Sequence, residues 1–213
     1  MSTPDEPAGR GEDVFTGVTV GIVTNNEDPE GLGRVKVTFP WRSTDDETLW
    51  APVVAPMAGD EMGTYFLPEV DDRVLVAFER GDFRYPYVVG SLWHENHAPP
   101  TENEGDNDIR TIRSRSGHQL SFDDDESEGK VQIETAAGHT ITLDDTSGSE
   151  TIKIEDSSGA NRIEFNPPSN ELSIESDGTL SIDAMAIEIS GTGNVSIEAG
   201  GVLSLDGMLI ELN

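Results

Sequence analysis

Residues 172–213 read LSIESDGTLSIDAMAIEISGTGNVSIEAGGVLSLDGMLIELN and contain no basic residue, no aromatic residue and no histidine. Aliphatic residues occur here in pairs separated by one residue, and Gly, Asp, Asn or Ser lies between successive pairs. This alternation is typical of strands with one apolar face, and the small residues between the pairs favour turns. We expect the pairs to form an inward-facing core, made of Leu172, Ile174, Leu180, Ile182, Ile187, Ile189, Val195, Ile197, Leu203 and Leu205.

The same pairs recur upstream of this stretch, back to residue 120. The step between first members is 9–11 residues before Leu172 and 7–8 residues after it, which predicts an object that tapers toward the C-terminus. A period of 21 residues overlays the early part, where Gly117, Gly138 and Gly159 align. The earlier pairs are Leu120/Phe122, Val131/Ile133, Ile141/Leu143, Ile152/Ile154 and Ile163/Phe165.

Strands with only two inward side chains have to stack on neighbours. Ordering each residue costs about 1–2 kcal/mol, whereas burying one aliphatic side chain returns roughly 1.5–3 kcal/mol. Two architectures satisfy this requirement, a single-chain β-solenoid and an intertwined prism of several chains. A single-chain coil needs three strands per turn, which leaves fewer than two coils in the late part, so a parallel homotrimer with a β-helical needle over residues 110–213 is favoured.

The N-terminal half differs in composition and in the spacing of its apolar residues. Short runs rich in β-branched and aromatic residues begin at residues 18, 34, 49, 73 and 85 and are separated by turn signals, without a helical stripe. This spacing predicts a small closed all-β barrel or a sandwich over residues 14–95, a region that also contains all three tryptophans. Residues 1–13 are expected to be a disordered lead, and residues 96–109, rich in Pro, Asn and acids, a linker.

The charge balance excludes some classes of partner. The 213-residue chain has 42 acidic and 13 basic residues, a formal net charge of −29, so nucleic acid and anionic membrane surfaces should repel it. Acid-rich, lysine-poor composition resembles that of proteins from salt-accumulating halophiles, because the Debye length falls to about 3 Å at 1 M salt; an acidic protein from an ordinary organism is the alternative. There is no cysteine, no secretory h-region and no apolar run long enough for a membrane span, which predicts synthesis in the cytoplasm.

Several motifs of the barrel occur in order and resemble one known family. GIVTNNEDPEGLGRVKVTFPW (21–41) and WAPVVAPMAGDEMGTYFLPEVDDRVLVAFERGDFRYPYVVGSLWH (50–94) are similar to the OB-fold domain of contractile-injection spike proteins. That family comprises phage baseplate assembly protein V and the VgrG spikes of type VI secretion. The resemblance implies an all-β chain with an N-terminal OB-fold barrel followed by a trimeric β-helical needle.

The resemblance also implies a role and partners. The protein would be the central spike of a phage tail or cell-encoded injection particle, which contacts the target membrane mechanically and reaches the target envelope or the exterior on contraction. The sequence contains no hub domain before the barrel, so the OB-fold domain is expected to bind a separate hub protein at the tube end. At the other end, Met208, Leu209, Ile210 and Leu212 are expected to form an interface for a PAAR-like tip protein.

No enzymatic activity, cofactor or metal is predicted from the sequence. A nucleophile elbow, a His-Glu-x-x-His motif and a phosphate loop are all missing, and acids at every turn make any carboxylate pair uninformative. An oligosaccharide-binding OB-fold module is the first alternative function, because OB-folds commonly bind sugars. A trimeric surface adhesin or tail fibre is the second, although it explains the repeat and not the barrel motifs.

Four further motifs favour structural explanations. Arg80-Gly81-Asp82 is expected to be a hairpin turn rather than an integrin-type ligand, and His94-Glu95-Asn96-His97 provides two histidines without a third metal ligand. His118 and His139 occupy equivalent repeat positions, where outward exposure is favoured over rings about a trimer axis. The acidic runs 123–125 and 144–145 lack the nonapeptide pattern of calcium solenoids and are expected to be solvated turns.

Overall fold

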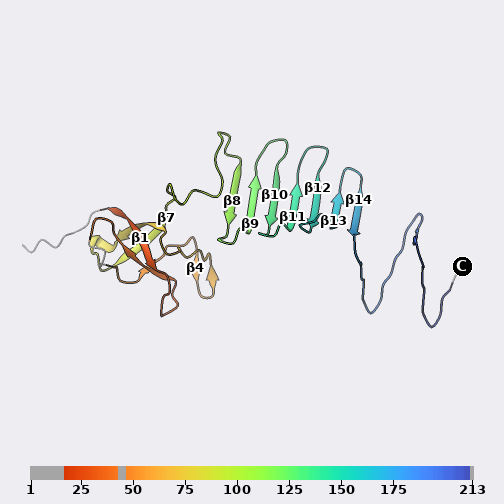
Figure 1. Cartoon of the computed structure of the whole chain (residues 1–213), viewed down its shortest axis with the longest axis horizontal. Coiled ribbons are helices and arrows are strands. Elements are labelled where there is room, and N and C mark those ends of the chain that lie inside the picture. The colour runs from red at the N-terminus through yellow and green to blue at the C-terminus, as the bar shows by residue number, and fades with distance from the viewer. Residues whose placement is uncertain (1–16, 43–46, 212–213) are drawn as a thin grey trace, which may run out of the picture. The chain divides into compact units, whose positions relative to one another are not determined.

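The computed structural model describes residues 17–42 and 47–211, which fall into two compact units, Met1–Asn107 and Asp108–Asn213 (Figure 1). The division between the units lies within the predicted linker of residues 96–109. The predicted lead at residues 1–13 lies outside the described residues. The proposed domain boundaries therefore stay predictions, and each unit is described by itself.

The first unit is a five-stranded antiparallel sheet that closes on itself. Its strands are β1 (Val18–Asn25), β2 (Arg34–Thr38), β3 (Ala51–Pro52), β6 (Arg73–Phe78) and β7 (Pro86–Ser91), in the spatial order β3-β2-β1-β6-β7. A parallel bridge between Val53 and Val88 joins the two edges, with Val54 N–H donating to the Val88 carbonyl at 2.8 Å. This order and closure agree with the predicted OB-fold barrel, because the OB-fold is a five-stranded, partly open Greek-key barrel.

The core of the barrel follows from strict alternation along these strands. Valines dominate it because β-branched side chains pack well on a pleated surface. Side chains between them point outward and are half-buried or exposed. The buried core residues are Val23, Val35, Val37, Phe39, Ala51, Val74, Val76, Phe78 and Val88.

One element of the barrel, a short hairpin, was not predicted. Strands β4 (Ala58–Gly59) and β5 (Met62–Gly63) pair only with each other and form a short hairpin in the connection between β3 and β6. The 3-10 turn η1 (Glu79–Gly81) connects β6 to β7 and contains the Arg-Gly-Asp tripeptide in part. Arg80 has φ of 52° and Gly81 has φ of 79°, so the tripeptide forms a tight turn, as expected.

The second unit begins with a seven-stranded antiparallel meander, in which every strand pairs with its neighbour in sequence (Figure 1). Turns with a glycine at positive φ, such as Gly117, Gly138 and Gly159, connect several of the strands. The strands are β8 (Ile109–Arg113), β9 (Gln119–Asp123), β10 (Lys130–Glu134), β11 (Thr140–Asp144), β12 (Thr151–Glu155), β13 (Asn161–Asn166) and β14 (Glu171–Ser176).

The chain after β14 is described as far as residue 211 and has no strand in that stretch (Figure 1). The last backbone–backbone hydrogen bond of the described unit runs from Asp177 N–H to the Ala160 carbonyl. A single chain thus shows a sheet over residues 109–176, whereas the β-helical needle stays a prediction.

Gly21 allows the closest approach of two barrel strands. A Cβ built on this residue would lie 2.2 Å from Val37 Cγ1, a buried side chain on the paired strand β2. We expect Gly21→Ala to destabilise the barrel by about 1–3 kcal/mol through overpacking, measured by thermal unfolding. Gly90→Ala is the matched control, because no atom lies within 4 Å of its built Cβ. Equal melting temperatures for the two variants would contradict this packing.

Candidate functional site

The β8–β14 sheet has one apolar face, built from two ladders of cross-strand neighbours. The register places Ile141 opposite both Ile133 and Ile154, and Leu143 opposite both Val131 and Ile152. The first ladder consists of Ile112, Leu120, Ile133, Ile141, Ile154, Ile163 and Ile174. The second ladder consists of Phe122, Val131, Leu143, Ile152, Phe165 and Leu172.

The opposite face of the same sheet is polar. Its central row runs through Thr142 and Lys153, which are cross-strand partners, to Glu164. Flanking charges pair along the strands and between them: Lys153 Nζ lies 3.0 Å from Glu155 Oε2, and Arg162 Nη2 lies 2.9 Å from Glu175 Oε2. This face has the composition expected of a solvent-facing surface.

The burial of the two faces is the reverse of what their chemistry requires. Ile152 and Ile154 are 43% and 47% exposed. Lys153, which lies between them on the polar face, is half-buried and therefore less exposed than either isoleucine. No described residue of the second unit is buried. A continuous exposed apolar face of this extent is typical of an interaction surface. We call it the ladder face.

The predicted needle core divides between two environments. Leu172 and Ile174 lie on β14, where they end the two ladders. The other eight residues, from Leu180 to Leu205, follow the sheet and are 52–74% exposed. Among the described residues 178–211, no backbone–backbone hydrogen bond is made within the chain. Both their side chains and their peptide groups therefore lack partners of the kind a folded strand needs.

The predicted tip interface is described in part. Met208 and Leu209 are fully or largely exposed, and Ile210 is 49% exposed. Leu212 lies outside the described residues.

His118 and His139 have a role that the sequence did not reveal. Each lies at a hairpin turn, and its Nδ1 accepts a hydrogen bond from the backbone of the next turn. Ala136 N–H donates to His118 at 3.2 Å, and Ser157 N–H donates to His139 at 3.1 Å. The repeated geometry follows the 21-residue period and connects consecutive turns on one edge of the meander.

The remaining acidic and histidine motifs also make local contacts. Asp125 accepts from the backbone N–H groups of Ser127 and Glu128, which lowers the pKa of its carboxyl. The rings of His94 and His97 stack at 4.5 Å, and desolvation lowers the pKa of His94. Within residues 17–42 and 47–211, no group of three or more potential ligands could hold a metal ion.

The loop between β1 and β2 is organised by one ion pair. Arg34 donates to Asp28 through Nε and Nη2, both at 2.8 Å, and the Asp28 side chain is only 2% exposed. The backbone N–H groups of Glu30, Leu32 and Arg34 donate to the same carboxylate. The guanidinium holds the pKa of the Asp28 carboxyl well below its usual range, and these backbone donors lower it further.

Comparison with known proteins matches the barrel. Residues 19–93 match the family model described as the type VI secretion system/phage-baseplate injector OB domain. The chain is 31% identical over 105 residues to the type VI secretion system spike protein VgrG3 of Vibrio cholerae serotype O1, which covers 45% of this chain and 10% of that protein. It is also 31% identical over 101 residues to the spike protein VgrG2a of Pseudomonas aeruginosa, covering 43% of this chain and 12% of that protein.

A third relative is named for an activity. The actin cross-linking toxin VgrG1 of another V. cholerae strain is 31% identical over 110 residues, which is 47% of this chain and 10% of that protein. The chain thus spans about a tenth of the length of the relatives it matches.

These matches agree with the barrel geometry and confirm the predicted resemblance. The first unit contains an injector OB domain, and the chain is VgrG-like. Its relatives include spike proteins of secretion-system particles. No helix among the described residues is long and apolar enough to cross a membrane.

The Asp28–Arg34 pair predicts a specific dependence on pH. The carboxyl has a lower pKa in the folded than in the unfolded chain, so its contribution to stability is present above the unfolded pKa of about 3.9 and is lost as pH falls toward the folded value. Asp28→Asn should therefore lower the melting temperature at neutral pH, and the difference from wild type should shrink below about pH 4. Glu27→Gln, in the same loop, should leave the melting temperature unchanged; a constant difference at all pH values would refute this assignment.

Proposed function

We propose that this protein is the central spike of a contractile injection particle, of a phage tail or a cell-encoded system. The observation that supports the proposal is the uncovered ladder face in a chain that also contains an injector OB domain. The similarity to spike proteins in two bacteria points to the same role.

We further propose that three parallel copies cover each other's ladder faces. Each chain would contribute one sheet over residues 109–176, with the ladders inward and the charged row outward. Beyond Asp177 the peptide groups of one chain would pair with those of the other two, because the described residues 178–211 make no backbone–backbone hydrogen bond in their own chain. Shorter steps between apolar pairs in this part agree with a narrowing needle.

The role would be mechanical rather than catalytic. The OB-fold domain would bind a separate hub protein at the end of the tube, and the needle would transmit force to the target envelope. The toxin named among the relatives shares only a tenth of its length with this chain, so its activity is not assigned here.

Two aspartate substitutions on neighbouring residues of β11 test the trimer. Ile141 lies on the ladder face and Thr142 on the polar face, opposite Lys153. The wild type and Thr142→Asp should have about three times the 23.0 kDa chain mass by light scattering. Ile141→Asp should not, because each buried carboxylate would cost several kcal/mol. A monomeric wild type, or a trimer of Ile141→Asp, would refute the proposed interface.

The trimer should also depend on salt. Residues 163–213 include nine acidic residues and no basic residue, and threefold symmetry would bring these charges together. We expect the melting temperature to fall as salt is lowered from about 1 M to about 0.1 M, where the Debye length grows from about 3 to about 10 Å. An unchanged or higher melting temperature at low salt would contradict this arrangement.

We also propose that a small conical tip protein of the PAAR type covers the end of the needle. Three copies of Met208, Leu209 and Ile210 would leave an apolar end with unpaired strand edges, which recruit other strands. The tip protein is expected to co-purify with the intact spike and not with a variant lacking residues 206–213. Unchanged binding after the deletion, or no binding by the intact spike, would show that the end closes by itself.

A further inference from the structure

The outer face of the barrel is apolar on one side only. Residues that point outward from β2, such as Arg34 and Lys36, are charged, as expected for a surface in water. On β1, β6 and β7, by contrast, most of the outward positions are apolar, with Arg73 of β6 an exception. The register sets Val18 and Val20 across from Ala77 and Leu75. We call this surface the outer sheet patch: Val18, Val20, Leu75, Ala77, Tyr87 and Val89. Val18, Val20, Tyr87 and Val89 are 37–53% exposed.

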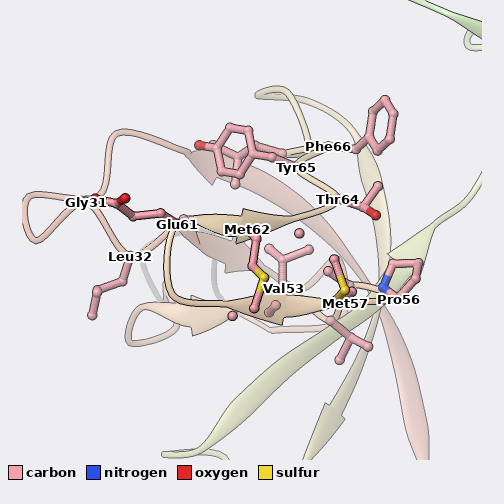
Figure 2. Close-up of a pocket in the computed structure, with 17 residues that line it drawn as sticks. Gly31, Leu32, Val53, Pro56, Met57, Glu61, Met62, Thr64, Tyr65 and Phe66 are labelled. Atoms are coloured by element: carbon pink, nitrogen blue, oxygen red, sulfur yellow. The ribbon is translucent and has the colours of Figure 1, made fainter.

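A second apolar surface lies on the connection that contains the β4–β5 hairpin. Met57, Met62, Tyr65 and Phe66 are 54–74% exposed there and border a groove of about 570 Å³ (Figure 2). The hairpin strands pair with each other and not with the barrel sheet. We call this surface the hairpin patch. Methionine and aromatic side chains without charge are the composition typical of an interface core.

Charged residues border both patches. In the outer sheet patch the Tyr87 hydroxyl donates to Glu79 Oε2 at 3.1 Å, and three further charges lie at the edges of the two patches. Asp60 and Glu61 form the tip of the hairpin, between β4 and β5. Arg73 lies at the border of the outer sheet patch, across from Ile22, and is exposed. Among the described residues, none of these three makes an ion pair. Joining the patches would bring both acids toward the arginine.

A second copy of the same chain fits these two surfaces. Copies related by a threefold axis touch through two different patches per chain, and such head-to-tail contacts close into a ring. The chain has a formal charge of −29, so copies can approach only through surfaces with little negative charge. We propose that, in the trimer of the proposed function on which this inference rests, the hairpin patch of each barrel packs on the outer sheet patch of the next.

The absence of cysteine from the chain allows a direct test in the full-length protein. Met62→Cys and Val20→Cys are made in separate, differently tagged chains, which are co-expressed and treated with a short bifunctional thiol reagent. One cysteine per chain excludes cross-links within a chain. Met62→Cys mixed with Lys36→Cys is the matched control, because Lys36 points outward from the polar strand β2.

We expect the first mixture to give a covalent product of about twice the 23.0 kDa chain mass on a denaturing gel, with tags from both chains. Each variant alone and the control mixture should remain at the single-chain mass. If light scattering gives the mass of three chains but the cross-linked product does not form, the inference is overturned and the proposed trimer is left intact. A monomer would overturn both, and a product from either variant alone would show a symmetric contact instead.

Discussion

The ladder face of β8–β14 is the surface from which the other properties of this chain follow. Its strands place two rows of aliphatic side chains on one side, and no described residue of the same unit buries them. Backbone hydrogen bonds within the sheet satisfy the peptide groups, but they do not remove the apolar area from water, which is the main source of folding free energy. In the proposed spike, further copies of the chain would cover this face of the sheet.

After β14, the described residues 178–211 lack backbone–backbone hydrogen bonds as well as cover for their apolar side chains. From residue 178 onward the described chain loses its own backbone pairing while the apolar pairs continue at shorter steps. In the proposed spike, each chain would form its own sheet over residues 109–176. The following residues would depend on other chains both for backbone hydrogen bonds and for cover of their apolar side chains. The OB barrel has a closed core of its own, which suits an anchor that would hold the assembly to a hub.

Much of this architecture could be predicted from periodicity. The five barrel strands and six of the seven strands of the meander coincide with apolar alternation, because alternate burial leaves a direct trace in sequence. Strand β8 was missed because its second-ladder position is Arg110, which pairs with Asp124 and interrupts the apolar pattern. The β4–β5 hairpin has two-residue strands, too short for any period to show.

The local contacts could be predicted much less well. The motif containing Asp28 and Arg34 was recognised as a family pattern, but its ion pair depends on how the loop folds back on itself. The hydrogen bonds of His118 and His139 join residues that are 18 apart in sequence and lie in different turns, so they follow from strand register rather than from composition. In the proposed trimer, the exposure of each side chain would also depend on the other two chains, whose positions cannot be predicted from the pattern of one sequence.

Hydrogen exchange of the intact protein, followed by mass spectrometry, tests the central claim most directly. Residues 178–211 make no backbone–backbone hydrogen bond within the described chain, so protection along this segment has to come from other copies. The account predicts that amides in this segment exchange far more slowly than in the denatured chain, comparably with those of β9–β13. Exchange at the denatured rate in this segment, with β9–β13 protected, would contradict the needle.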